Sequence, residues 1–213
     1  MIKLSQGSIS GYAQLMTRSA AARDSYHHGN LPETLIREGA RLLAERGIES
    51  FSTREVARRT GVSVAAPSHH FGSSKGLLTA IATQGFEILG KEMARATDAA
   101  GGAENAISAM CRAYIDVGAQ YPGHATVMFR LDLLDDADAS FRDCSFRAFG
   151  LLREAVERAV GDHAADMDIS NATKTLWATM HGVMTLTMIK QGEAIELVEF
   201  TTRTLLAGMR EAY

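Results

Sequence analysis

Proline is scarce in this chain, which has only three prolines among 213 residues, and few stretches alternate β-branched and polar side chains. With few helix breakers and little strand-type alternation, the sequence favours helices that are separated by short turns. Hydrophobic residues make up 46% of the chain and charged residues 22%, which is ordinary globular composition and excludes disordered and fibrous classes. The sequence therefore predicts an all-α fold of about nine helices.

Cysteine is equally scarce, and Cys111 and Cys144 do not form a paired CxxC spacing. A disulfide framework is thereby excluded, and both thiols are expected to pack as small reduced groups, with a redox switch as the alternative. No stretch approaches the roughly 20 uninterrupted apolar residues of a membrane helix, and the first residues do not resemble a secretion signal. We therefore expect a cytoplasmic protein without a membrane segment.

Charge is unevenly distributed along the chain. Residues 1–80 hold 10 Lys and Arg against 6 Asp and Glu, whereas the rest holds 12 against 19, so the net charge of −3 hides a basic N-terminal third. Such a region favours an anionic partner, while a solvated surface that varies by chance is the alternative.

Helix boundaries follow from N-cap residues, glycines and the period of the apolar positions. Residues 1–25 show weak periodicity and are expected to form a mobile tail, in which Met16 is an alternative start to Met1. The longer predicted helices span residues 31–46, 74–97, 103–120, 136–160, 171–191 and 194–211, and a short one spans 123–129.

Two further short helices follow the first long one. Ser52 and Glu55 have the spacing of a capping box for the first of them, which is expected to end at Gly61. Ser63 is then expected to cap the second, over residues 64–71.

These two helices meet the requirements of a helix-turn-helix, which needs a small residue at the crossing and a flexible residue in the turn. Ala57 is the small residue, Gly61 can adopt the left-handed backbone of the turn, and Val62 is expected to seal the crossing from below. The second helix then presents small side chains to solvent, which would let its backbone lie deep in a major groove. These side chains are Val64, Ala65, Ser68 and His69.

Residues around this surface suit contacts with phosphate. Thr53 and Arg54 lie at the N-terminus of the first short helix, where the helix dipole favours an anion. Lys75, near the start of the next helix, can contact another phosphate. Arg58 and Arg59 lie at the opposite end of their helix, so a solvated charged face is the simpler interpretation for them.

The segment from Tyr26 to Leu78 resembles the DNA-binding domain of the tetracycline-repressor (TetR) family, in the stretches YHHGNLPETLIREGARLLAERGIESFSTREVARRTGVS and HHFGSSKGLL. The resemblance implies a DNA-binding domain at residues 26–78, whose third helix enters the major groove, and a ligand-binding and dimerisation domain at residues 79–213. It also implies that Lys75 touches backbone phosphate. Ser68 departs from the family pattern, because a tyrosine usually stands there and supplies a phosphate contact.

The histidines do not indicate a metal site. His69 and His70 are adjacent and point to different faces of a helix, and no second pair has the i, i+4 spacing that presents two ligands together. His27 and His28 precede the first helix, where they are interpreted as a solvated tail or, alternatively, as an arm that reaches the minor groove. We expect neither a metal nor another cofactor.

The C-terminal part lacks a glycine-rich phosphate loop, a nucleophile elbow and paired carboxylates, so we do not expect an enzyme. Its helices are rich in methionine and aromatic residues, which core packing alone would explain. Trp177-x-x-x-His181-Gly182 is similar to a Trp-His-Gly element of one TetR subgroup, and this similarity favours a pocket for a hydrophobic or amphipathic inducer. The candidate pocket residues are Met110, Tyr114, Phe129, Phe149, Trp177, His181 and Met184.

In the TetR family the last two long helices pair with their two-fold mates, which implies a homodimer. The candidate interface residues are Trp177, Val198, Leu205 and Met209. A dimer holds two recognition helices about 34–36 Å apart, so that they read successive turns of DNA. We therefore predict a repressor that binds a palindromic operator and is released by its inducer, with a helical protein adaptor and an enzyme using His181 as alternatives.

Overall fold

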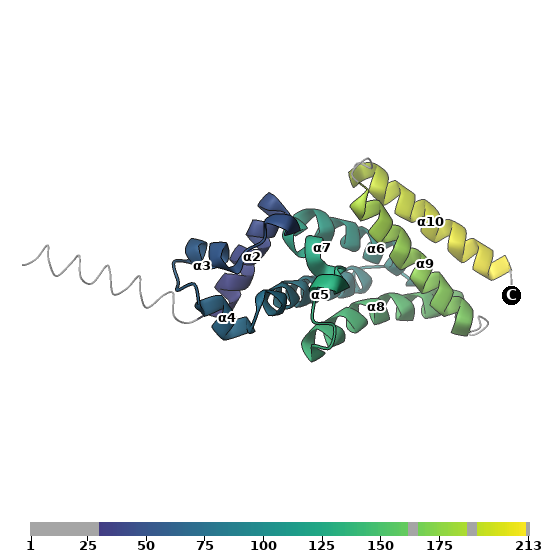
Figure 1. Ribbon diagram of the computed structural model, residues 1–213. Coiled ribbons are helices and arrows are strands. Elements are labelled where there is room, and N and C mark those ends of the chain that lie inside the picture. The colour runs from purple at the N-terminus through teal and green to yellow at the C-terminus, as the bar shows by residue number, and fades with distance from the viewer. Residues whose placement is uncertain (1–29, 162–165, 187–190, 212–213) are drawn as a thin grey trace, which may run out of the picture.

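The computed structural model describes residues 30–161, 166–186 and 191–211 of the chain. Within these ranges it consists of nine α-helices and two short 3-10 helices, without a strand (Figure 1). The predicted all-α class is therefore confirmed. The tail expected at residues 1–25 and the pair His27 and His28 lie outside the described residues.

Most helix boundaries lie within two residues of those expected from the sequence. In chain order the helices are α2 (Leu31–Arg46), α3 (Thr53–Thr60), α4 (Ala66–Phe71), α5 (Ser74–Asp98), α6 (Ala103–Gln120), α7 (Pro122–Met128), α8 (Ala139–Val160), α9 (Asp166–Thr185) and α10 (Gln191–Glu211). The 3-10 helices Ile48–Ser50 and Leu131–Leu133 follow α2 and α7.

Helices α8, α9 and α10 depart further from expectation. α8 begins at Ala139 rather than near residue 136, because the Asp138 carboxylate caps the helix and accepts the N–H of Phe141 at 2.9 Å. α9 begins at Asp166, five residues early, because Ile169 packs into the core and extends the apolar face toward the helix start. α10 begins three residues early, at Gln191.

The long helix α5 connects the two ends of the molecule. Helices α2, α3 and α4 gather at the end where α5 begins, and α5 then runs between α6, α7 and α8 (Figure 1). Helices α9 and α10 lie side by side at the far end. A continuous set of buried side chains runs from Leu35 in α2 to Leu206 in α10, so the same core supports both ends.

Helix α7 approaches α2 so closely that glycine is needed at the contact. A β-carbon on Gly123 would lie 2.7 Å from the carbonyl carbon of Ala40, closer than real side chains come. This contact joins the N-terminal helices to the C-terminal ones at a second place besides α5.

Both cysteines are free thiols, as expected. Cys111 is buried in α6, and burial raises the pKa of its thiol to about 12. The Cys111 thiol is therefore protonated at neutral pH and packs as a small apolar group. No helix among the described residues has the length and apolar character that a membrane span needs.

Candidate functional site

Helices α3 and α4 cross as the sequence predicted for a helix-turn-helix. Ala57 is fully buried at the crossing, and its carbonyl accepts the N–H of Val62 at 3.1 Å. Gly61 adopts the left-handed conformation, with φ 71° and ψ 24°, which a side chain would disfavour. Val62 packs against the core from below. The turn therefore forms through the three residues predicted for it, Ala57, Gly61 and Val62.

The capping box expected at the start of α3 does not form. Ser52 occupies the N-cap position without a side-chain hydrogen bond. The Glu55 carboxylate instead accepts hydrogen bonds from Arg58, at 2.7 and 2.8 Å, and from Arg59 at 3.2 Å. Charge-assisted bonds of this kind are stronger than a bond to a neutral backbone N–H, so the carboxylate turns toward the guanidinium groups.

Helix α4 is shorter than predicted, and Ser63 does not cap it. Ala65 stands at the N-cap position, and the Ser63 carbonyl accepts the N–H of Ala66 at 3.0 Å within a preceding turn. Pro67 lies in the first turn of α4, where its fixed φ and missing N–H are tolerated, and this favours a helix that begins just before it. Val64 therefore projects from the turn and not from the helix.

The predicted recognition surface is exposed. Val64 is 57% exposed, and Ala65, Ser68 and His69 are exposed as well. Burial of these side chains would have excluded a role in contacting DNA. His70, which the sequence analysis did not assign to this surface, is also exposed, with its ring 5.4 Å from that of His69.

Two cations flank this surface. Arg54 is exposed in the first turn of α3, beside the half-buried Thr53. Lys75 is exposed in the first turn of α5, where the Ser73 hydroxyl caps the helix by accepting the N–H of Gly76 at 3.1 Å. No ion pair between described residues involves Arg54 or Lys75, so both are available to an anion.

Arg58 and Arg59 belong to an ion-pair network. Arg59 binds Glu45 of α2 at 2.7 Å and Glu55 of its own helix at 3.2 Å, so it links α3 to α2. The hydrogen bonds from Arg58 and then Arg59 lower the pKa of Glu55 to about 2. Arg58 is exposed, as expected of a solvated charged face, whereas Arg59 is half-buried and links two helices.

A second candidate site lies inside the C-terminal half, where five predicted pocket residues meet. The ring of Trp177 lies 5.4 Å from that of Tyr114 and 5.5 Å from that of Phe149. The ring of Phe129 lies 4.3 Å from that of His181. We call these five side chains the aromatic cluster. They come from α6, α8 and α9 and from Phe129, which directly follows α7.

The aromatic cluster contains one polar pair. The Tyr114 hydroxyl and the His181 Nδ1 are 3.2 Å apart and share a hydrogen bond. Burial raises the pKa of Tyr114 and lowers the pKa of His181, because each charged form would lose hydration. Both groups are therefore neutral at neutral pH, and the pair offers polarity without net charge.

Two family models match the chain. The model of bacterial regulatory proteins of the tetR family matches residues 35–81, which include α3 and α4. The model of the tetracyclin repressor-like C-terminal domain matches residues 107–205, which include the whole aromatic cluster. The chain carries a TetR-family DNA-binding domain and a TetR-like C-terminal domain.

Solved structures show the same fold. A protein of unknown function from Rhodococcus sp. RHA1 is 29% identical, with a TM-score of 0.71 over 86% of this chain and 97% of that chain. The TetR-family regulator PfmR from Thermus thermophilus is 19% identical, with a TM-score of 0.65 over 81% and 97%. The fatty acid degradation regulator FadR from Bacillus halodurans is 16% identical, with a TM-score of 0.64 over 83% and 98%. No curated protein matches the chain in sequence.

Members of the TetR family are DNA-binding transcriptional regulators and not enzymes, so these two predictions are confirmed at the level of the family. The match to a Trp-His-Gly subgroup stays a prediction.

The remaining predicted pocket residues of this TetR-like domain are methionines. Met110 is fully buried in α6, and Met184 lines a small cavity beside Tyr114 and Phe129. The sequence analysis missed Gly118, which also lines this cavity. An isolated glycine within a helix often marks a close approach by another group, and this rule could have found it.

The predicted dimer face needs one correction. Val198 is only 1% exposed, because it faces the interior of its own subunit and cannot contact a partner. Leu197 and Phe200, which the sequence analysis did not select, are 41% and 59% exposed on α10. Leu205 and Met209 are half-buried and line a groove of about 410 Å³ between α9 and α10. Trp177 is half-buried and belongs to the aromatic cluster.

Proposed function

We propose that this TetR-type regulator is a homodimeric repressor that binds a palindromic operator through α4 and is released by a small apolar inducer. The observation that carries the proposal is the exposed face of small and polar residues on and before α4, flanked by two cations that have no carboxylate partner among the described residues. In this proposal residues 26–78 form the DNA-binding domain and residues 79–213 the ligand-binding and dimerisation domain.

The chemistry of the face suits a major groove. Val64 and Ala65 are small enough to let the backbone approach the bases, and Val64 can contact a thymine methyl group. Ser68 and His69 carry groups that can hydrogen-bond to base edges. Contacts of this type specify sequence.

Contacts with phosphate would place the helix in register. Arg54 and Lys75 supply positive charge, and Thr53 lies at the positive end of the α3 dipole. Ser68 cannot replace the longer tyrosine that usually stands at its position, so we expect one phosphate contact fewer than in typical relatives.

Dimerisation would occur through α9 and α10. The exposed Leu197 and Phe200 lie on the outer side of α10, and large exposed apolar side chains are typical of an interface. Leu205 and Met209 line the adjacent groove and can extend this contact. Two-fold symmetry then places two copies of α4 on successive turns of the duplex.

Release would follow from ligand binding in the aromatic cluster. An inducer that binds the DNA-incompetent state more tightly shifts the dimer toward it, and α5 is the helix that connects the cluster to α4. Linkage requires that operator DNA weaken inducer binding by the same factor.

Selection of bound sequences from a random pool of duplex DNA tests the proposal. We expect an enriched inverted repeat whose half-sites are about one helical turn apart. Affinity for it should fall steeply with salt, because bound phosphates release counterions. If no sequence is enriched, and if the chain binds a protein partner with an affinity that does not change with salt concentration, the helical protein adaptor is favoured instead.

A further inference from the structure

The cavity beside the aromatic cluster, which Tyr114 and Phe129 help to line, holds almost no free space. The cavity between α5, α6, α7 and α9 measures about 10 Å³, which is no more than one water molecule needs. Its lining residues are Leu89, Tyr114, Val117, Gly118, Tyr121, Ala125, Met128, Phe129 and Met184. An organic ligand therefore cannot enter unless a side chain leaves.

Methionine side chains occupy notches that two helical glycines leave open. A β-carbon on Gly118 of α6 would overlap the sulfur of Met184 from α9. A β-carbon on Gly85 of α5 would lie 2.6 Å from the sulfur of Met128 from α7. Methionine is flexible and fills irregular gaps, so a thioether in such a notch can be exchanged for another apolar group.

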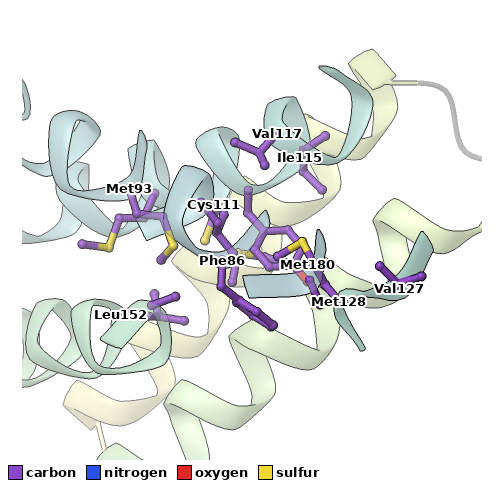
Figure 2. Close-up of a cluster of buried hydrophobic side chains, with 14 of the residues drawn as sticks. Phe86, Met93, Cys111, Ile115, Val117, Val127, Met128, Leu152 and Met180 are labelled. Atoms are coloured by element: carbon purple, nitrogen blue, oxygen red, sulfur yellow. The ribbon is translucent and has the colours of Figure 1, made fainter. Parts of the chain in front are cut away.

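Met184 is better placed to move than Met128. Met128 is 3% exposed and belongs to the buried cluster that also contains Phe86 and Met180 (Figure 2). Met184 is only half-buried and lies in the last turn of α9, where the neighbouring Leu186 is 48% exposed. Its side chain can therefore turn toward solvent without breaking the core.

We propose that Met184 is a displaceable plug, and that the ligand replacing it is an uncharged aromatic compound with one hydrogen-bonding group. The inference rests on the proposed function in that it concerns the site assigned to the inducer. Turning Met184 out of its notch on Gly118 joins that notch to the existing cavity beside Tyr114 and Phe129.

The lining determines this class of ligand. Its residues are apolar or aromatic apart from the tyrosine hydroxyls, so a buried carboxylate or ammonium group would lose hydration without gaining a partner. The rings of Tyr114 and Phe129 favour an aromatic guest through edge-to-face contacts. Tyr114 lines the cavity, and its hydroxyl, which shares a hydrogen bond with His181 Nδ1, is the neutral polar group that one hydroxyl or amide group of the ligand would meet.

Binding of p-cresol to the full chain tests the plug, with 4-methylbenzoate as a charged compound of similar shape. Trp177 is the only tryptophan in the sequence and lies in the cluster, so its fluorescence locates the event while calorimetry measures the affinity. In Met184→Ala the plug is absent, and we expect p-cresol to bind about tenfold more tightly than to the wild type. 4-Methylbenzoate should bind neither protein.

Met93→Ala is the matched control. Met93 is another fully buried methionine, which does not line the cavity and lies well apart from Met128 (Figure 2). This variant should bind p-cresol as the wild type does, although it also creates space in the core. Should Met184→Ala fail to fold, Met184→Leu shortens the plug and is expected to gain about threefold.

Equal p-cresol affinity in the wild type and the folded Met184 variant would overturn the proposal, as would comparable binding of 4-methylbenzoate. The experiment contains no DNA and so separates the plug from the proposed function. Tighter p-cresol binding combined with failed operator selection would contradict the repressor alone. An enriched operator without any effect of Met184 would contradict the plug alone.

Discussion

At the scale of single residues, the side chains of the helix-turn-helix that can contact DNA bases lie in a different place from those that can contact the DNA backbone. His69 and Ser68 are exposed on α4, whereas Lys75 and Arg54 are exposed in the first turns of neighbouring helices. Base contacts discriminate between sequences, and phosphate contacts do not. Substitutions in the two groups should therefore have different consequences.

Replacing Lys75 by Ala should weaken binding to all duplexes alike and reduce the slope of log affinity against log salt concentration by about 1, because one phosphate contact is lost. Replacing His69 by Ala should instead relax preference at one position of each half-site. Fluorescence anisotropy with the selected operator and its single-base variants measures both effects. A uniform loss in both variants would contradict the role of His69 in base recognition.

Stability should depend on pH through the buried histidines. His124 is 9% exposed and hydrogen-bonds to Gln84 Oε1 at 2.9 Å, and burial lowers its pKa below the ordinary value of 6.5. The unfolded chain therefore takes up protons first as pH falls. The free energy of unfolding should decrease as pH falls through the ordinary value of 6.5 and level off below the folded pKa.

Urea unfolding at several pH values checks this expectation. His124→Gln keeps a donor toward Gln84 but cannot titrate, so its stability should vary less between pH 7 and 5 than that of the wild type. Its stability at pH 7 should be nearly unchanged. An unaltered pH dependence in this variant would assign the effect to another group, such as His181, whose pKa is also lowered by burial.

At the scale of helices, the contact between α2 and α7 is the closest link between the two halves besides α5. Gly123 lies against the backbone of Ala40, and α7 also contributes Met128 and Ala125 to the cavity beside the aromatic cluster. A ligand in that cavity would therefore touch a helix that contacts the DNA-binding half directly.

Gly123→Ala should push α7 away from α2, because its methyl group overlaps backbone that cannot move aside as a side chain can. We expect a loss of about 1–3 kcal/mol of stability from overpacking and a change in operator affinity. Gly150→Ala in α8 is the control, since its β-carbon would meet nothing within 4 Å and should be neutral or slightly stabilising. Thermal unfolding and operator titration report both effects, and equal behaviour of the two variants would exclude the contact as a coupling point.

At the scale of the whole molecule, the assembly depends on which exposed apolar side chains meet a partner. Phe200 on α10 is 59% exposed and Phe146 on α8 is 65% exposed, so exposure alone does not decide between them. Phe200 has an exposed apolar neighbour, Leu197, and belongs to the pair of helices through which we propose dimerisation. Phe146 is instead partly covered by Arg142, whose guanidinium carbon lies 5.9 Å from the ring centre.

Phe200→Glu should therefore dissociate the proposed dimer, because it would introduce negative charge into the apolar surface of both subunits at the proposed interface. Operator affinity should fall with it, since each subunit would bind one half-site alone. Phe146→Glu is the matched control and should remain dimeric. Analytical ultracentrifugation distinguishes the two variants, and dissociation by Phe146→Glu alone would place the interface on α8.

Local sequence alone determined the turn that positions α4 and the course of most helices, although not the ends of α8, α9 and α10. Gly61 requires a left-handed backbone, Pro67 restricts where a helix can begin, and Ala57 leaves room for a crossing, whatever the rest of the chain does. The composition and apolar periodicity likewise determined the all-α class, because both arise within each helix.

Tertiary structure decided which groups meet. Arg59 joins Glu55 of its own helix to Glu45 of α2, a link that only the packing of α3 against α2 creates. The unformed capping box has a local cause, since Glu55 binds Arg58 in the same helix at 2.7 and 2.8 Å. Packing also decides which side chains of α10 are exposed. Val198 is buried and Leu197 is exposed because packing against α6 and α9 sets the rotation of the helix, which periodicity does not.

The same distinction applies to the aromatic cluster. Spacing placed Tyr114, Trp177 and His181 on apolar stripes, but only the packing of α6 against α9 brings the Tyr114 hydroxyl to His181 and the Met184 sulfur to Gly118. A sequence specifies backbone preferences over a few residues through local sterics. Contacts between distant helices depend on how all their surfaces fit together, and that fit belongs to the folded molecule.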